Sequence, residues 1–394
     1  MGARHILIFF SGCVTLLAAV EILFRLAVFP DWRIVSRAPF LNHPIYGTFQ
    51  KPNLEIRRYN PPNYDVLNRT NDDGFRDHQV GFEEDLNSMW IAGLSNSYGG
   101  FVEDSETYAQ ILQDSYGYKN ALLASEGHLL MNQVKVMRHL HQKGYRPSMV
   151  VLEITLNNNF RPYEQGLDEL SRPFFAPEVS DQSQTSEGAA EGLLRRGRGM
   201  FWGLVELDFV GVKGRLINNS AIYAWIKVGI NSIPFLRSWT LKLGLRSDPA
   251  TFDNVPLEML RVGRATPHDH LINDLVTYTS AIEGWVRTEL NAEFAVIILP
   301  SKHHTNPDWF QRYLKIQGSD GTGLDPARPH DLFVAALEKK GIPVLSLAKP
   351  MLGAGQFLNY PDDGHFNARG HAIIARELAE WLKERFRRVP DLVP

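Results

Sequence analysis

Short apolar runs alternate with segments of helical periodicity along most of this 394-residue chain. The runs have the length and composition of buried strands, and they occupy residues 88–93, 121–124, 149–154, 294–299 and 342–345. Apolar residues recur at helical spacing in residues 106–116, 131–142, 271–290, 331–340 and 374–382. Strands that alternate with helices are typical of βαβ units, whose strands are parallel and whose helices cover the sheet. The pattern therefore predicts an α/β protein, a three-layer α/β/α sandwich with a mainly parallel sheet.

Composition limits what such a chain can bind. Hydrophobic residues make up 44% of the chain, which is enough for one large domain or two small ones. The 41 basic and 44 acidic residues nearly cancel, to a formal net charge of -3, so no basic surplus favours a nucleic-acid partner. Cys13 is the only cysteine, and an intrachain disulfide is therefore impossible.

The N-terminal segment, residues 6–29, is apolar enough to form a membrane anchor. No charge occurs from Ile6 to Val20, and Glu21 and Arg25 come late, where a helix leaves the hydrocarbon or packs on a partner. A helix needs about 20 mostly apolar residues to cross a bilayer. We therefore predict one N-terminal transmembrane helix. A cleaved signal peptide is the alternative, although no A-x-A site follows the apolar run.

The flanks of this segment indicate its orientation. Arg4 precedes the span. A basic residue there favours a short N-terminus on the cytoplasmic side of the plasma membrane and a large domain on the extracytoplasmic, or periplasmic, side. Arg33 and Arg37 on the far side weaken this prediction. A lipoprotein signal that ends at Cys13 is a further alternative. Because the chain stays apolar well beyond Cys13, a small lipid-facing residue is expected there instead.

We divide the chain into an anchor at residues 1–30, a stalk or packing segment at 31–84 and an α/β domain at 85–394. The stalk carries several turn signals, so we predict that it is irregular and packs onto the domain. An insertion at about 165–268 interrupts the domain. Within it, residues 200–245 are rich in Trp, Leu and Ile and are predicted to be helical, covering one side of the sheet or the rim of its site.

Small and polar residues follow the predicted strands. In open parallel sheets, ligands bind at the carboxyl ends of the strands. Ser95 follows the first strand, Gly127 the second and Asn158 the third, and His365 comes after the last. Serines are also common in turns, so the partners of Ser95 decide whether it is a nucleophile.

Together these residues contain the parts of an acyl-transfer site. A serine hydroxyl becomes a useful nucleophile when a base takes its proton, and His365 is the candidate base for Ser95. Asp362 or Asp363 is the candidate carboxylate that orients the imidazole. A tetrahedral oxyanion needs preorganised donors. The candidate donors are the backbone N–H groups of Ser95 and Gly127 and the side-chain amide of Asn158.

These segments resemble the four blocks of the SGNH/GDSL hydrolase family, which centre on a serine, a glycine, an asparagine and a histidine. The matching segments, in the same order, are GLS at 93–95, EGH at 126–128, NNN at 157–159 and DDGH at 362–365. Two other segments resemble membrane-anchored bacterial members of the family, including relatives of alginate O-acetyltransferases. They are NDDGFRD at 71–77 and PSKHH at 300–304.

The resemblance implies an SGNH/flavodoxin-like fold and a serine ester hydrolase or O-acyltransferase. Such a protein would act through an acyl-enzyme on acyl esters, above all acetyl esters, of cell-envelope glycans, beside other proteins of envelope biosynthesis. No metal or organic cofactor is implied. Hydrolysis and transfer differ in whether water or a sugar hydroxyl accepts the acyl group, and both remain open.

Two positions depart from the family pattern. Leu94 stands where the family has the aspartate of GDS, so the turn before the serine has to be held by other groups. Asn159 replaces the aspartate of the third block and removes a charge near the oxyanion donors. These departures motivate an alternative, a non-catalytic glycan-binding or scaffold protein. The distance between His365 Nε2 and Ser95 Oγ discriminates between the two.

Other polar residues are predicted to have structural roles. His268, Asp269 and His270 precede a helix, and neighbouring side chains point apart, so a solvated turn is expected there and no metal site. The same expectation applies to His303 and His304. Three single residues complete the set: Lys302 as a rim lysine in water, Phe75 as the residue that packs the stalk, and Asn367 as the N-cap of the last helix.

Overall fold

The structure is a computed structural model, and the residues it describes fall into two compact units. The described residues are 3–36, 39–60, 63–76, 85–126, 130–156, 219–243, 250, 255–263, 265–266, 268–355 and 357–386. The first unit comprises residues 1–38 and 166–231, and the second comprises residues 39–165 and 232–394. Most of the predicted insertion lies outside the described residues.

A five-stranded sheet forms the centre of the second unit. All of its neighbouring strands are parallel, in the order β6-β5-β7-β8-β9. The strands are β5 (Met89–Ala92), β6 (Asn120–Leu122), β7 (Met149–Thr155), β8 (Glu293–Leu299) and β9 (Val344–Ser346). This is the flavodoxin-like order, in which the chain reverses its direction of winding between β5 and β7. The predicted parallel α/β sheet is therefore confirmed.

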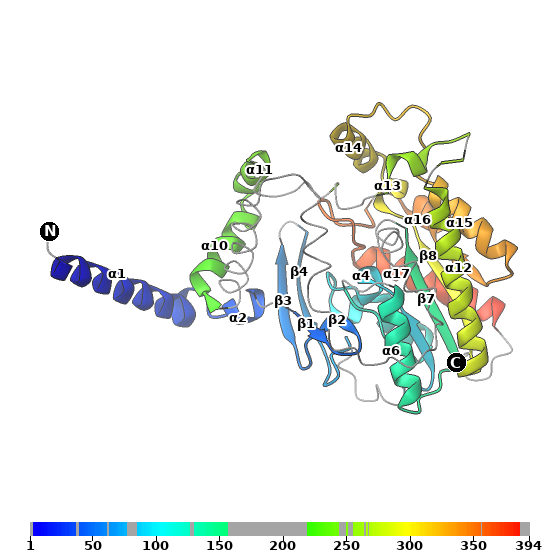
Figure 1. Ribbon diagram of the computed structural model, residues 1–394, viewed down its shortest axis with the longest axis horizontal. Helices are drawn as coiled ribbons and strands as arrows, with labels where there is room; N and C mark the ends of the chain where they lie inside the picture. The colour runs from blue at the N-terminus through cyan, green and yellow to red at the C-terminus, as the bar shows by residue number, and fades with distance from the viewer. Residues whose placement is uncertain are drawn as a thin grey trace. The chain divides into compact units, whose positions relative to one another are not determined.

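Helices cover both faces of this sheet, with α6 and α12 on one face and α17 on the other (Figure 1). The core on the α17 side is formed by every second residue of the central strands, such as Met149 and Val151, together with Leu112 of α5 and Leu378 of α17. The helices are α5 (Tyr108–Tyr116), α16 (Ala348–Ala354) and α17 (Ala368–Arg385), then α6 (Leu130–Gln142), α12 (Asp269–Trp285) and α15 (Arg328–Lys339). A π-helical turn, Val286–Leu290, extends α12.

The shorter elements lie mainly around the carboxyl ends of the strands. They are α4 (Ser95–Tyr98), a 3-10 turn (Asp104–Glu106), α11 (Pro234–Lys242), a 3-10 turn (Leu257–Leu260), α13 (Lys302–Thr305) and α14 (Pro307–Gln317). All five predicted strands are present, and their ends lie within two residues of the predicted ones. Asn367 is the N-cap of α17, as predicted, because its side chain accepts a hydrogen bond from Gly370 N at 3.1 Å.

The prediction of an irregular stalk is wrong, because this segment contains two antiparallel hairpins. Their strands are β1 (Phe40–His43) with β2 (Gly47–Gln50), and β3 (Glu55–Asn60) with β4 (Tyr64–Arg69). The turn signal NPPNY stands between β3 and β4, where it ends one strand and begins the next. Turn signals were therefore correct locally, but the strands between them are short, polar and only partly buried, so they lack a clear alternation of apolar residues.

The packing of the stalk against the domain by Phe75 stays a prediction, and Phe75 itself is buried against the first hairpin. It is 1% exposed, and its ring lies 5.2 Å from that of Phe49, between ring centroids. Gly74 precedes it with φ of +88°, and a Cβ atom there would lie 2.6 Å from the carbonyl oxygen of Gln50. Both the conformation and the close approach require glycine at this position.

The first unit contains the predicted anchor. Its elements are α1 (Ala3–Leu23), a π-helical segment (Phe24–Val28), α2 (Trp32–Ser36) and α10 (Ala221–Ser232). Residues Ile8–Val28 form one continuous helical stretch with a mean hydropathy of 1.9, long and apolar enough to cross a membrane. Large side chains along it, such as Phe9 and Leu17, are exposed.

Glu21 lies inside this apolar stretch and binds the start of α10. Its carboxylate accepts hydrogen bonds from Ala221 N at 2.7 Å, Ser220 Oγ at 3.0 Å and Ile222 N at 3.3 Å, and from Arg25 Nε at 2.9 Å. A carboxylate is favourable at the first amides of a helix. A charge in an apolar helix is costly unless it is paired. Glu21 and Arg25 therefore pack on a partner, which was one of the two predicted possibilities.

Two buried histidines should make the free energy of unfolding of the second unit depend on pH. His371 of α17 is 1% exposed, and its Nδ1 accepts a hydrogen bond from Tyr108 N at 3.2 Å. His330 of α15 is 4% exposed, and its Nε2 lies 2.8 Å from Ser346 Oγ. Burial lowers the pKa of each histidine to about 3. An imidazole in the unfolded chain binds a proton below about pH 6.5.

Between about pH 3 and pH 6.5 the unfolded chain binds more protons than the folded one. The free energy of unfolding should therefore fall as the pH falls through this range. Each histidine should contribute a slope of about 1.4 kcal/mol per pH unit. The variant His371→Gln keeps an acceptor for Tyr108 N and should remove one such contribution. Denaturant unfolding of both proteins at several pH values checks this, and an unchanged slope would contradict it.

Candidate active site

Ser95 is presented by a tight turn at the carboxyl end of β5. The strand ends at Ala92, Gly93 and Leu94 form the turn, and Ser95 is the first residue of the short helix α4. Its N–H group is at a helix start and has no partner within the helix. Because the direction of winding reverses between β5 and β7, this is the edge at which open α/β sheets bind ligands.

Gly93 allows this turn because its surroundings leave no room for a side chain. A Cβ atom at Gly93 would lie 2.7 Å from Ser97 Cβ and 2.8 Å from Glu153 Oε2. Real Cβ contacts are not this short, so any larger residue has to move the turn or the carboxylate. Glycine is thus required here by packing and not by its backbone angles.

Glu153 of β7 holds the turn that contains Leu94. Its side chain accepts hydrogen bonds from Leu94 N at 3.0 Å and from Ser97 Oγ at 3.0 Å, and from Thr155 Oγ1 at 2.5 Å. Glu153 is fully buried, and this burial raises its pKa although the hydrogen bonds act in the opposite direction. The sequence predicted that other groups hold the turn, but Glu153 was not identified, because in sequence it is one residue of an apolar strand.

Arg76 fixes the chain that follows Ser95. Its guanidinium is buried and donates to the carbonyl oxygens of Tyr98, Gly99 and Val102, at 2.7 Å for Tyr98 and 2.6 Å for Val102, and to Asp104 Oδ1 at 3.0 Å. Carbonyl groups at the end of a helix have no partners within it. The arginine of the NDDGFRD segment therefore satisfies the carbonyl end of α4, while Glu153 holds its beginning.

A hydrogen-bonded chain joins Ser95, His365 and Asp363. The Nε2 atom of His365 lies 2.9 Å from Ser95 Oγ, and its Nδ1 atom lies 2.5 Å from Asp363 Oδ1. The backbone N–H of His365 also donates to Asp363 Oδ1, at 2.9 Å. Ser95 and His365 are half-buried. The arrangement is that of a hydroxyl, a base that can take its proton, and a carboxylate that orients the base.

The environment keeps the carboxylate of Asp363 ionised. Burial raises the pKa of Asp363, but the charge of His365, the hydrogen bonds from His365 and the charge of Lys302 together hold it below its ordinary value. An ionised carboxylate fixes the proton of His365 on Nδ1 and leaves Nε2 free to accept a proton from Ser95.

Asp362, the other candidate orienting residue, does not contact His365. Its carboxylate pairs with Arg237 of α11 at 2.5 Å and with Arg312 of α14 at 3.4 Å, and its backbone N–H donates to Asn63 Oδ1. Neighbouring side chains on a non-helical chain point in different directions, so only one of the two aspartates can face the imidazole. The structure brings Asp363 to it.

Lys302 is buried, and the prediction of a rim lysine in water is wrong. Its side chain is 3% exposed, and Nζ donates to the carbonyl oxygens of Tyr360, Pro361 and Asp363, at 2.6, 3.0 and 3.1 Å. The ammonium also lies 3.5 Å from the centre of the Trp309 ring. Lys302 thus closes the loop that carries Asp363. No signal in the sequence predicts this, because the loop comes from a segment about sixty residues further along.

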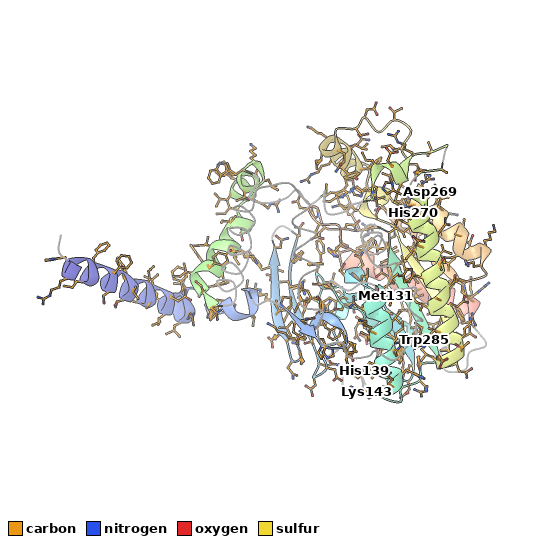
Figure 2. The ribbon with its side chains drawn as sticks, viewed as in Figure 1. Met131, His139, Lys143, Asp269, His270 and Trp285 are labelled. Atoms are coloured by element: carbon orange, nitrogen blue, oxygen red, sulfur yellow. The ribbon has the colours of Figure 1, made fainter. Side chains whose placement is uncertain are left out.

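The neighbouring histidines and Asp269 also have structural partners. His303 is buried against the ring of Tyr313, at 4.5 Å between centroids, so the predicted solvated turn is wrong there. Asp269 and His270 lie in the first turn of α12 (Figure 2). Both carboxylate oxygens of Asp269 accept hydrogen bonds from Arg328, at 2.9 and 2.8 Å, and this pairing holds the pKa of Asp269 well below its usual range.

The β3–β4 hairpin supplies a wall of the site that sequence reasoning missed. The Phe101 ring lies 4.3 Å from the His365 ring, and the Tyr64 ring lies 4.8 Å from that of Phe101. Behind Phe101, Arg58 forms a 3.0 Å ion pair with Glu126, the residue before Gly127. Gly127 and Asn158, the other predicted oxyanion donors, lie outside the described residues, as does Asn159.

Comparison with known proteins gives only distant similarities. No protein-family model and no curated protein matches the sequence. Among solved structures, a psychrotrophic esterase from Pseudoalteromonas sp. matches at 12% identity and a TM-score of 0.33, over 77% of this chain and 100% of that chain. A protein from Lactobacillus plantarum matches at 13% identity and a TM-score of 0.33, over 76% of this chain and 97% of that chain.

Gly93→Ala should displace Ser95 and destabilise the fold. The added Cβ atom overlaps Ser97 and Glu153, and overpacking of this kind costs about 1–3 kcal/mol. We expect a lower free energy of unfolding and loss of Ser95 reactivity towards a fluorophosphonate probe. Gly284→Ala is the matched control, because no atom lies within 4 Å of its Cβ position in α12. It should stabilise the protein by about 0.5–1 kcal/mol. Equal behaviour of the two variants would refute this account.

Lys302→Met should loosen the loop that carries Asp363 and slow the reaction of Ser95 with the probe by about 100-fold, the effect of a small misplacement of reacting groups. The exposed Lys315→Met on α14 is the control and should react normally. Removing the ammonium should also raise the pKa of Asp363, so the acid limb of the pH profile should move to higher pH. A variant that folds and reacts like the unsubstituted protein would show that Lys302 does not position the loop.

Proposed function

We propose that this protein is a serine esterase or O-acyltransferase that works through an acyl-enzyme. The observation that carries the proposal is the chain of hydrogen bonds from Ser95 Oγ through His365 to Asp363, at 2.9 and 2.5 Å. Its position at the carboxyl ends of β5 and β7 supports the same conclusion, because ligands bind at this edge of such sheets. His365 lies within hydrogen-bond reach of Ser95, which weakens the alternative of a non-catalytic scaffold.

The reaction begins when Ser95 Oγ attacks the carbonyl carbon of an ester while His365 Nε2 takes the hydroxyl proton. The carbonyl π electrons become the oxyanion, which accepts from the N–H of Ser95 and, in our proposal, from Gly127 and Asn158. When the oxyanion collapses, the C–O bond to the leaving alcohol breaks, and that oxygen receives the proton from His365. Water or a second alcohol then attacks the carbonyl carbon of acyl-Ser95 and gives its proton to His365. The bond from that carbon to Ser95 Oγ breaks, Oγ takes the proton back from His365, and the acid or the new ester is released.

Acyl esters of cell-envelope glycans, above all acetyl esters, are our narrower proposal for the substrate. The sequence resemblance and the N-terminal apolar helix motivate it. The half-buried ring of Phe101 lies beside that of His365, the ring of Tyr64 lies beside Phe101, and that of Tyr360 lies beside Tyr64. Such aromatic surroundings suit a ligand with both apolar and polar surface. The relation to alginate O-acetyltransferases stays a prediction. We likewise propose that the helix Ile8–Val28 anchors the protein in the plasma membrane with its α/β domain outside the cytoplasm.

The test is covalent labelling of the full-length protein in detergent with a fluorophosphonate probe, followed by hydrolysis of p-nitrophenyl acetate and acetylated sugars. Ser95→Ala should abolish labelling, whereas the exposed Ser238→Ala on α11 should not change it. Removal of one member of such a triad lowers turnover by about 10⁴-fold or more. A folded protein that does not label would refute the proposed enzyme.

The two neighbouring aspartates provide a matched pair in the same assay. Asp363→Asn should lower the rate by about 10⁴-fold, because an amide favours the wrong tautomer of His365. Asp362→Asn removes a carboxylate that faces Arg237 and Arg312 and should have a much smaller effect. Equal rates in the two variants would mean that Asp363 does not orient the base.

A further inference from the structure

Helix α11 carries an exposed apolar face. Phe235 is 73% exposed, Trp239 is 52% exposed and Leu243, the C-cap residue, is 52% exposed. These residues are four apart and therefore lie on one side of the helix. Lys242 is exposed on the same side. Three large apolar side chains in one exposed row are unusual for a helix that only faces water.

The opposite side of α11 is fixed to the catalytic loop. Arg237 is 17% exposed and forms the 2.5 Å ion pair with Asp362, which directly precedes Asp363. At 100° per residue, Arg237 points about 200° away from both Phe235 and Trp239. The ion pair thus holds the helix with its apolar row outward.

Helix α10 is hydrogen-bonded to the apolar anchor and precedes α11 directly in the chain. The first amides of α10 donate to Glu21, which lies within the candidate span Ile8–Val28. Trp225 and Ile226 of α10 are themselves 47% and 45% exposed. Helix α10 ends at Ser232 and α11 begins at Pro234, so a single residue separates them. Helix α10, which is bonded to the anchor, is therefore joined to α11 by one residue, and both helices carry exposed apolar side chains.

We propose that α11 lies in the interface of the same bilayer that holds the anchor, with Phe235, Trp239 and Leu243 at the boundary between headgroups and acyl chains. Tryptophan is typical of this zone, and Lys242 can reach anionic headgroups from the same side. This inference rests on the proposed membrane attachment. It assigns the loop of Asp362 and Asp363 a position close to the bilayer surface, and with it a preference for ester substrates or acceptors presented there.

Depth measurement with nitroxide labels tests the proposal. The full-length chain with Cys13→Ser receives single cysteines in place of Phe235 or Trp239 and is placed in phosphatidylethanolamine–phosphatidylglycerol vesicles. Collisions with oxygen, which enters lipid, are compared with collisions with a water-soluble nickel chelate. Leu332→Cys, an exposed apolar position on α15, is the aqueous control, and Leu17→Cys reports the anchor. We expect oxygen to be favoured at positions 17, 235 and 239, and the chelate at 332.

Each other outcome overturns the proposal and identifies the reason. Positions 235 and 239 in water with position 17 in lipid would mean that the anchor spans the bilayer and α11 does not touch it. A label at position 17 in water would mean that the chain is not attached to the membrane, and the proposed binding of α11 to the bilayer would then be wrong as well. Labels shielded from both reagents, with spin–spin broadening, would mean that a second copy of the chain covers the face. Fluorophosphonate labelling of Ser95 in the same samples reports the proposed enzyme separately.

Discussion

The buried carboxylate of Glu153 ties the turn before Ser95 to the central strand of the sheet. It accepts from Leu94 N, and a Cβ atom on Gly93 would overlap it. Burial of a polar group away from solvent is tolerated when the group is hydrogen-bonded, as Glu153 is. Arg76 acts on the other end of the same short helix through three carbonyl groups. The short helix that begins at Ser95 is therefore held at both ends by buried side chains.

The second half of the site depends on positive charge. The segment that carries Asp363 and His365 has no helix or strand, so its carbonyl groups need partners from elsewhere. Lys302 supplies three donors from a single ammonium group. The same charge contributes to the lowered pKa of Asp363. One buried cation thus both shapes the loop and stabilises the ionised form of its carboxylate.

Sequence patterns predicted the parts of this protein that depend on local order. The buried strands and covering helices follow from apolar periodicity, and Ser95 and His365 follow from their places after strands. The hairpin wall with Tyr64 was missed, because partly buried edge strands show no alternation. Glu153 was not identified, and Lys302 was wrongly predicted to be exposed, for a different reason. Their roles arise from contacts between segments that are distant in sequence. Local sequence patterns do not show which distant segment a residue will contact.

The two neighbouring aspartates show how one short segment serves two purposes. Because their side chains diverge, Asp363 faces the imidazole while Asp362 faces the arginines of α11 and α14. Loss of the ion pair with Arg237 would leave a carboxylate of the catalytic loop without one of its two arginine partners. If α11 contacts a bilayer as proposed, this ion pair would connect that contact to the residue beside Asp363. The ion pair of Arg237 with Asp362 thus joins α11 to the loop that carries Asp363.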